Sequence, residues 1–390
     1  MGIAIGFITS EYPHVKCSSG GGIATTTRNL AIALIHQGVA VSVFVYGQEK
    51  DEIFEDNGIK IHTIKQKKYS NFTWYFNRKS LQNYINEFIA LDKIDLIEAP
   101  DWTGITAFMN LNAPLVLRFH GSDAYFCHLE KRRQKLKNFI FEKMAIRNAV
   151  AYISPSEFTS KITQFIFRIK NKPIIKIPSG LSLEKFHNAS PTDYEKGLIL
   201  YMGTIIRKKG VLELAPIFEK VLSECPESQL IIVGSDSYDI KTKSESTWLL
   251  LQNALNGSTI ARVKYLGKVP YDTIQKYIQK ANVCVFPAFA ETQGMVTIEA
   301  MAMQKSVVNS NIGWAVEILE NEKSGFLVHP KNHDEFANRI IQVIQNENLY
   351  LSIGKAAREK VEADFNINTL VKRNIEFYNS IIKKKKQNDI

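Results

Sequence analysis

Two glutamates, Glu291 and Glu299, stand eight positions apart in a stretch whose residue types suit the binding of sugars. Carboxylates accept hydrogen bonds from hydroxyl groups, and a helix that began at once would place the two about two turns apart on one face. Gln293 lies between them and adds an amide. The alternative is a pair of solvated glutamates on an ordinary strand, loop and helix, because such spacing also arises by chance.

The same stretch offers backbone donors for an anion. Gly294 would let a ligand approach the main chain closely, and the N–H groups of Met295 and Val296 would open the helix that follows. The dipole at a helix N-terminus favours phosphate. The stretch is therefore expected to hold a phosphate beside sugar or ribose hydroxyls.

Strands and helices alternate along the chain, which is typical of a parallel sheet covered by helices. Strands are predicted at 3–8, 40–46, 59–64, 94–98, 114–119, 149–153 and 173–177, and again at 197–203, 229–235, 262–269 and 282–286. The expected fold class is α/β, with two facing doubly wound, Rossmann-like domains and a cleft between them. The predicted divisions are residues 1–187, a linker at 188–196, residues 197–368, and a C-terminal helix at 369–390 that returns to the first domain and carries a basic tail.

A glycine-rich loop follows the first predicted strand and precedes a helix. Gly21 and Gly22 lie in this loop, in the arrangement by which α/β folds cradle phosphate. The loop does not have the GxGxxG spacing of dinucleotide-binding folds, and a plain flexible loop is the alternative.

Two later loops carry polar groups at the expected carboxyl ends of strands. Asp101 and Trp102 lie in the first of these loops, and His120 and Asp123 lie in the second. A histidine placed directly after an apolar strand and before a glycine suits ligand binding, although a lone histidine is most often structural.

Composition limits the cellular setting. The 390-residue chain carries a net charge of +10, and its four cysteines show no metal-binding spacing, so they are expected to be reduced. There is no basic leader and no apolar run long enough to span a bilayer, which predicts a cytoplasmic protein. No acidic pair suited to a divalent metal is evident.

Basic residues gather in residues 131–147, where they alternate with apolar residues, and again at 383–386. The pattern predicts a basic amphipathic helix that would bind anionic lipid at a membrane surface. A solvated helix face packed on its own domain is the alternative. Nucleic acid is a weaker expectation, because no recognisable nucleic-acid module is present.

Four motifs together resemble the retaining glycosyltransferases of family four, which have the GT-B fold. They are YPHVKCSSGGGIA near the start, HGSD midway, MGTIIRKKG after the linker and ETQGMVTIEAMA. The resemblance spans nearly the whole chain in the family's order. It implies an acceptor-side first domain and a nucleotide-sugar-binding second domain.

The resemblance also implies a role for each matched residue. Gly21 and Gly22 would face the donor phosphates and the acceptor, His120 would touch the donor sugar, and Arg207, Lys208 and Lys209 would neutralise the leaving diphosphate. Glu291, with Gln293 near it, would bind sugar hydroxyls, the backbone of Gly294, Met295 and Val296 would lie beside them, and Glu299 would bind the ribose. His120, Lys209 and Glu291 are the expected catalytic residues, while Asp101, Trp102 and Asp123 are acceptor candidates.

The sequence departs from the family's pattern at two positions. Thr204 stands where many relatives have arginine, so Arg207 or Lys208 would have to supply that charge. Gln293 stands where phenylalanine is common, which leaves the identity of the sugar open.

The implied reaction is transfer of a hexosyl group from a nucleotide-sugar, with UDP favoured over GDP, to a glycan or lipid-linked acceptor. No metal or cofactor is implied. The alternatives are another GT-B enzyme, such as a nucleotide-sugar epimerase, and a catalytically silent nucleotide-sugar-binding partner of a membrane assembly.

Overall fold

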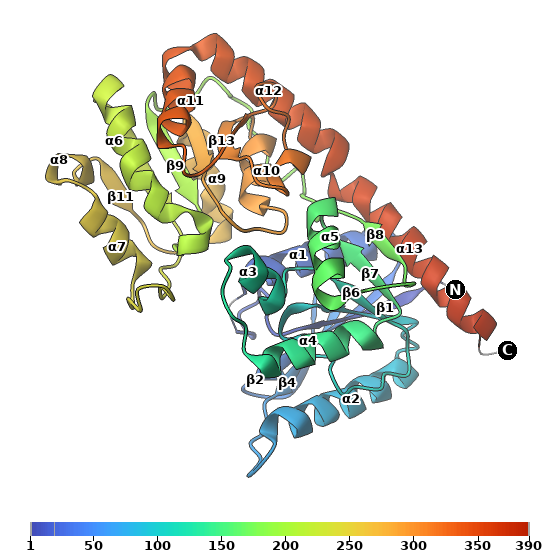
Figure 1. The fold of residues 1–390 in the computed structure, drawn as a ribbon. Helices are drawn as coiled ribbons and strands as arrows, with labels where there is room; N and C mark the ends of the chain where they lie inside the picture. Colours follow the sequence, from blue (N-terminus) through green and yellow to red (C-terminus); the bar gives the residue numbers. More distant parts are fainter. Residues whose placement is uncertain (1, 19, 389–390) are drawn as a thin grey trace. The chain divides into compact units, whose positions relative to one another are not determined.

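The computed structural model describes residues 2–18 and 20–388 and contains two compact units (Figure 1). Unit 1 comprises Met1–Gly180 and Ile367–Ile390, and unit 2 comprises Leu181–Asn366. Ser19 of the predicted glycine loop, the side chain of Lys386 in the predicted basic tail, and the last two residues of the predicted C-terminal helix lie outside the described part. Each unit is built on its own largely parallel sheet.

Unit 1 holds an eight-stranded sheet in the order β3-β4-β2-β1-β5-β6-β7-β8. The strands are β1 (Ala4–Thr9), β2 (Ala40–Gln48), β3 (Glu52–Asp56), β4 (Ile59–Lys65), β5 (Leu96–Pro100), β6 (Leu115–Arg118), β7 (Ala151–Ser154) and β8 (Ile174–Lys176). Only the β3–β4 pair is antiparallel among the described strands of this sheet. The helices are α1 (Gly22–His36), α2 (Thr73–Leu91), η1 (Trp102–Gly104), α3 (Asp123–Leu129), α4 (Leu136–Asn148), α5 (Glu157–Phe167) and α13 (Ile367–Asn388).

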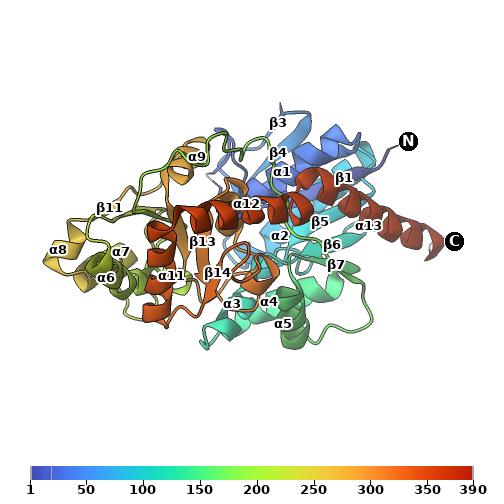
Figure 2. The ribbon, with the colours of Figure 1, turned by 90° about the horizontal axis from the view of Figure 1, so that it is seen from above.

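Helices cover both faces of this sheet because alternate strand residues point to opposite sides. On one face, Phe7 and Val43 pack with α1 and α13, which lie side by side (Figure 2). On the other face, Ile8 and Phe44 pack with residues of α2, α4 and α5. The chain therefore closes unit 1 with its last helix.

A buried polar network ties that last helix to the sheet. Arg118 on β6 donates two hydrogen bonds, of 2.7 and 3.0 Å, to the carboxylate of Glu98 on the neighbouring β5. Arg118 also donates to Asn374 at 2.6 Å, and the Tyr378 hydroxyl donates to Glu98 at 2.6 Å. Bidentate geometry and full pairing are what make a buried ion pair tolerable.

Unit 2 holds a six-stranded parallel sheet in the order β11-β10-β9-β12-β13-β14. The strands are β9 (Leu198–Met202), β10 (Gln229–Val233), β11 (Val263–Tyr265), β12 (Val283–Phe286), β13 (Ser306–Ser310) and β14 (Phe326–Val328). The helices are η2 (Arg207–Lys209), η3 (Val211–Glu213), α6 (Leu214–Glu224), α7 (Thr247–Ala254), α8 (Gly257–Ile260), α9 (Tyr271–Lys280), α10 (Met295–Ala302), η4 (Ala315–Glu317), α11 (His333–Gln345) and α12 (Glu347–Asp364).

The predicted strands are confirmed in both units, but the basic helix is shorter than expected. Lys131 has a left-handed backbone conformation, with a φ of 53°, so the helix does not continue through this residue. The next helix, α4, begins only at Leu136. Arg132, in the intervening loop, forms ion pairs with Asp123 and Glu130. The continuous helix expected over 131–147 is therefore wrong for its first third. Within the described residues, no helix has the length and apolarity that crossing a bilayer requires.

The buried network gives a test of how α13 is held. Replacing Arg118 with methionine leaves the buried carboxylate of Glu98 without its cation, so we expect the free energy of unfolding to fall by about 3–5 kcal/mol. Urea unfolding would measure the loss, and hydrogen exchange would assign it to unit 1. Arg262→Met is the control, because Arg262 pairs with an exposed Glu227 and should change stability by less than about 1 kcal/mol. Equal losses in the two variants would contradict the assignment.

Candidate functional site

The strand order of unit 2 reverses direction between two central neighbours, β9 and β12. From β9 the chain continues outward through β10 and β11, while from β12 it continues outward through β13 and β14. Loops that leave the carboxyl ends of two such strands diverge and leave a crevice, which is where ligands bind in open α/β sheets. The loop after β9 carries the basic residues 207–209, and the loop after β12 carries Glu291.

These two loops are joined to each other. Phe289 and Ala290 donate their backbone N–H groups to the carbonyl oxygen of Lys208, at 2.8 and 3.3 Å. Lys209 forms an ion pair with Glu291, and the two side chains are 23% and 14% exposed. The sequence predicted Lys209 and Glu291 as separate contacts to the ligand. In the structure they form an ion pair with each other at the switch point, the place between β9 and β12 where the strand order reverses.

Glycines allow this close approach. Gly210 has a φ of 70°, and a Cβ atom there would overlap the carbonyl oxygen of Pro287. Gly294, with a φ of 77°, is the residue before α10 and turns the chain into that helix. Both positions need glycine, because L-residues with side chains rarely adopt this conformation.

The structure brings four of the predicted residues into one small pocket: Lys209, Glu291, Gly294 and Val296. Seven further residues complete the lining, namely Tyr201, Met202, Phe286, Ala288, Thr297, Asn309 and Trp314. The N-terminus of α10 opens on this pocket and presents backbone N–H groups beside Lys209. A cation, a carboxylate and helix N–H groups together can bind an oxyanion next to hydroxyl groups.

Glu299 lies one turn into α10 and is buried rather than solvated. Its carboxylate accepts a hydrogen bond of 2.8 Å from the Tyr271 hydroxyl, and burial raises its pKa to about 7. Because α10 begins at Met295, Glu291 lies in the preceding loop, and the two glutamates do not share a helix face. Gln293 is also buried, at 5% exposure.

Arg207 is committed to an acidic partner. Its guanidinium donates two hydrogen bonds of 2.8 Å to Asp239, which is 1% exposed. This hydrogen-bonded cation holds the pKa of Asp239 well below its usual range. Thr204, which stands where the resemblance leads us to expect arginine, is exposed.

The sheet of unit 1 also reverses its strand order, in this case between β1 and β5. The glycine loop follows β1, and Gly21 and Gly22 are exposed at the start of α1. Gly21 donates its N–H to the Glu11 carboxylate at 2.5 Å. The start of α1 has no side-chain cap, and the carboxylate of Glu11 already accepts the N–H of Gly21 there.

His120 follows β6 on a loop that is held by two buried carboxylates. Asp101 accepts the N–H groups of His120 and Ser122 at 2.8 and 3.1 Å. Glu142 accepts the N–H groups of Asp123 and Ala124 at 2.8 and 3.1 Å. Burial raises the pKa of Asp101 to about 7 and lowers that of His120 to about 3, so the imidazole is neutral near pH 7.

The three acceptor candidates therefore differ in access. Asp101 is 1% exposed and both of its oxygens receive backbone donors, so in this structure it positions the His120 loop. Trp102 is 40% exposed in η1 and is accessible to a ligand. Asp123 begins α3 and pairs with Arg132.

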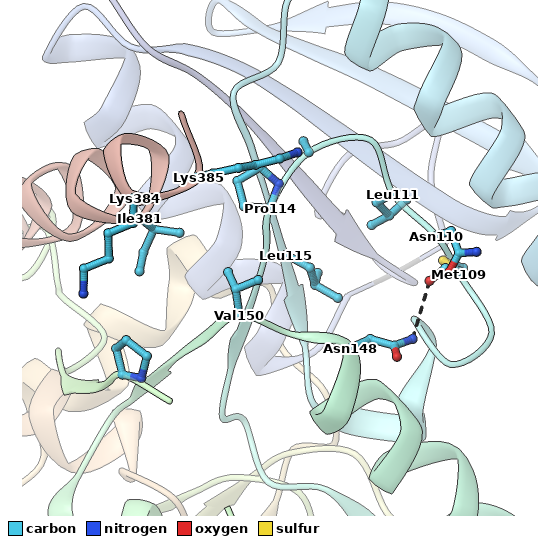
Figure 3. A pocket seen from close by; sticks show the side chains of 12 residues that line it. Met109, Asn110, Leu111, Pro114, Leu115, Asn148, Val150, Ile381, Lys384 and Lys385 are labelled. Atoms are coloured by element: carbon cyan, nitrogen blue, oxygen red, sulfur yellow. Dashed lines mark hydrogen bonds between the residues drawn. The ribbon is translucent and has the colours of Figure 1, made fainter. Parts of the chain in front are cut away.

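One large pocket lies away from all of these residues. It has a volume of about 630 Å³ and is formed by residues at the amino ends of β6 and β7 together with α13 (Figure 3). Its lining contains none of the predicted site residues. We do not place the chemistry there, because the ends of parallel strands that carry ligand sites are the carboxyl ends.

Several residues of the site carried no signal in the sequence. Tyr271, at the start of α9, reaches Glu299 on α10 with a hydrogen bond of 2.8 Å, and Asn309 reaches Thr297 from β13 with a hydrogen bond of 3.2 Å. Glu142 was hidden among the lysines of the basic segment. Their hydrogen-bond partners lie between 12 and 28 positions away along the chain. Local sequence patterns give no information about contacts at that separation.

The chain matches two glycosyltransferase families in succession. Residues 20–185 match Glycosyltransferase Family 4, and residues 183–360 match the Glycosyl transferases group 1. The two matches together take in most of both units.

Similar proteins agree with this. An uncharacterized glycosyltransferase of Methanocaldococcus jannaschii is 25% identical over 394 residues, which is 96% of this chain and 97% of the relative. The capsular polysaccharide biosynthesis glycosyltransferase CapM of Staphylococcus aureus is 29% identical over 257 residues, covering 63% of this chain and 65% of CapM.

Solved structures share the fold. The sucrose-phosphate synthase of Thermosynechococcus elongatus superimposes with a TM-score of 0.79 at 21% identity, covering 98% of this chain and 100% of that one. Anabaena HepE in complex with UDP superimposes with a TM-score of 0.70 at 18% identity, covering 97% and 100%. The chain therefore belongs to the group 1 glycosyltransferases of family four and has the GT-B fold, with two Rossmann-like units.

Proposed function

We propose that the chain transfers a hexosyl group from a nucleotide-sugar, with UDP preferred and GDP second, to a hydroxyl of a glycan or lipid-linked acceptor, with retention at the anomeric carbon. The product would be a cell-surface polysaccharide or glycoconjugate. The observation that carries this proposal is the Lys209–Glu291 pair at the switch point of unit 2, beside the N-terminus of α10.

In this proposal the ion pair opens when the donor binds. Lys209 exchanges Glu291 for the diphosphate, and the backbone N–H groups at the start of α10 add further donors. Glu291 is then free to accept hydrogen bonds from hydroxyls of the transferred sugar. Glu299, which is buried and accepts a hydrogen bond from Tyr271, would also accept one from the ribose.

The reaction forms a bond between the acceptor oxygen and the anomeric carbon and breaks the bond from that carbon to the phosphate oxygen. The acceptor approaches from the face that the phosphate leaves, and the departing phosphate oxygen takes the hydroxyl proton. No carboxylate serves as a nucleophile in this scheme. Charge that develops on the diphosphate is stabilised by Lys209 and by the helix N–H groups.

His120 would contact the donor sugar as a neutral imidazole, since its pKa is lowered to about 3. A neutral ring donates one hydrogen bond and accepts another, which suits a sugar hydroxyl. We further propose that the reaction needs no metal or cofactor, because fixed cations and backbone dipoles supply the positive charge.

The choice of donor rests on relatives. HepE was solved with UDP and with UDP-glucose, and CapM is described as acting in capsular polysaccharide biosynthesis. These properties belong to those proteins. Because they are similar to this chain, we place UDP first among the nucleotides and propose a polysaccharide as the product.

Donor binding is testable by calorimetry in EDTA with UDP, GDP, ADP and their hexose conjugates. We expect one nucleoside diphosphate to bind, and Lys209→Met to weaken that binding by tenfold or more, since a charge-assisted hydrogen bond contributes about 1.5–3 kcal/mol. Glu291→Gln should weaken the sugar conjugate more than the free diphosphate. Lys280→Met, which removes an exposed lysine paired with Glu195, is the matched control.

Four outcomes would count against the proposal. Binding of no nucleotide, or equal binding by wild type and Lys209→Met, would contradict the donor site. Turnover of the nucleotide-sugar to an epimer without acceptor would favour the epimerase alternative. Donor binding with no transfer to any offered acceptor glycan would favour the silent-partner alternative.

We also propose that unit 1 binds an anionic membrane surface through residues 131–147, with the protein otherwise cytoplasmic. Leu136 and Ile140 lie one turn apart on α4 and are 72% and 43% exposed, and Lys131 and Arg133 are exposed just before them. Exposed apolar residues flanked by cations suit the interface of a bilayer that contains acidic lipid.

Co-sedimentation with phosphatidylcholine vesicles, with and without phosphatidylglycerol, tests this surface. The variant Lys131→Glu, Arg133→Glu, Leu136→Asp should lose binding to the acidic vesicles. Lys264→Glu, Lys355→Glu introduces two charge reversals at exposed positions of unit 2 and should retain it. Binding that persists in the first variant, or none in the wild type, would overturn the membrane proposal.

A further inference from the structure

Tyr271 is bonded to a residue of the candidate donor site without being one of the predicted ligands. It is the first residue of α9, and its side chain is 37% exposed. Its hydroxyl donates a hydrogen bond of 2.8 Å to the Oε1 atom of Glu299 on α10. Because α9 follows β11 and α10 follows β12, this bond joins two helices that begin at the carboxyl ends of different strands.

The two carboxylate oxygens of Glu299 have different surroundings. Oε1 accepts the hydrogen bond from Tyr271. Within the described residues, Oε2 receives no hydrogen bond, and it is not one of the side-chain atoms that are sealed from solvent without a partner. The residue as a whole is 7% exposed. Oε2 can therefore accept a hydrogen bond from a hydroxyl group that does not belong to the chain.

No cation supports the negative charge of Glu299 among the residues that the structure describes. Burial raises the pKa of this carboxyl to about 7, and the hydrogen bond from Tyr271 acts in the opposite direction. The elements that pack against α10 are β12, β13 and α12, and none of their titratable groups contributes to the shift. In the described part of the chain, Tyr271 is thus the one group that favours the ionised form.

The ring of Tyr271 is itself held in place. It contacts the ring of Phe186 edge-to-face, with 5.8 Å between the ring centroids. Phe186 is buried, and its carbonyl oxygen accepts a hydrogen bond of 2.6 Å from Arg358. The first turn of α9 is closed by Thr273, which donates its hydroxyl and its N–H to the carbonyl oxygen of Pro270 at 2.7 and 3.0 Å. The hydroxyl of Tyr271 is therefore delivered to Oε1 from a fixed ring.

We propose that Tyr271 is a positioning residue for Glu299, which occupies Oε1 and leaves Oε2 as the acceptor for a hydroxyl of the donor ribose. The inference rests on the proposed donor site of unit 2. It makes the pair selective for ribose over deoxyribose. A nucleotide without the ribose hydroxyls leaves a largely buried carboxylate oxygen without a partner, which costs affinity.

This role has a consequence for the pH dependence of binding. An ionised carboxylate accepts a stronger hydrogen bond than a protonated one. Since the pKa of Glu299 is raised to about 7, its ionised fraction increases as the pH rises through that value, and the preference for ribose increases with it. Without the Tyr271 hydroxyl the pKa is higher still, so the same increase occurs at a higher pH.

The test compares the affinities of UDP and 2′,3′-dideoxy-UDP by calorimetry from about pH 5.5 to about pH 8.5. The guanosine pair is used if GDP is the nucleotide that binds. The ratio of the two affinities is the readout, because titration of the diphosphate and of the cations around it affects both compounds alike. We expect the wild-type chain to prefer UDP by about tenfold or more at the upper end of this range, and the preference to decline below pH 7.

Three variants assign the effect. Tyr271→Phe removes one oxygen and keeps the ring on Phe186, so it should fold, show a smaller preference at pH 7 and move the rise to a higher pH. Glu299→Gln cannot ionise and should show a weak preference that does not change with pH. Tyr277→Phe is the matched control, since Tyr277 also lies on α9 but is not bonded to Glu299, and it should keep the wild-type profile.

The results separate this inference from the proposed function. A Tyr271→Phe profile equal to that of the wild type would overturn the role of Tyr271 and leave the donor site intact. The same holds for equal binding of the two nucleotides by the wild type, or for a wild-type preference that does not change with pH. If the wild type binds neither UDP nor GDP, the proposed donor site fails, and the role of Tyr271 fails with it.

Discussion

The arrangement of both units depends on a constraint of parallel sheets. The carboxyl ends of all parallel strands lie at the same end of the sheet. The loops that leave two neighbouring strands there diverge only where the strand order reverses. In unit 2 that place lies between β9 and β12, and the basic loop and the glutamate loop meet there. The hydrogen bonds from Phe289 and Ala290 to Lys208, and the glycine at 210, then fix how closely the two loops approach.

Charges in the site are paired in advance. Lys209 faces Glu291, and Arg207 faces Asp239. A ligand that carries a diphosphate and hydroxyl groups can pair with Lys209 and Glu291 at the same time. Replacing the ion pair by this ligand therefore costs less free energy than leaving either charge unpaired in the protein.

Buried carboxylates in unit 1 serve mainly as scaffold. Asp101 and Glu142 hold the backbone around His120, and Glu98 holds Arg118 and Tyr378, which secures α13. Asp101 and Glu142 thus hold the loop that carries His120 in place. The imidazole of His120 remains available at the carboxyl ends of the strands.

Much of the fold followed from the sequence, because apolar runs and glycine-bearing turns mark each strand. The antiparallel β3 was missed, since Glu52–Asp56 is a short strand at the sheet edge in which three of the five residues are charged. The basic segment was predicted as one helix because periodicity does not reveal the left-handed backbone at Lys131. Of the site, the residue types around Glu291 and Gly294 were readable, and the motifs added Lys209. The pairing of Lys209 with Glu291 and of Glu299 with Tyr271 was not readable, because it depends on packing between distant segments.

The central claim is that the Lys209–Glu291 pair exchanges partners with the donor. A crystal structure of the chain with a bound UDP-hexose tests it most directly. The account predicts that the Lys209 Nζ atom leaves Glu291 and contacts a phosphate oxygen, while Glu291 accepts hydrogen bonds from the sugar. A donor bound with the ion pair intact, or with its diphosphate away from the start of α10, would contradict it.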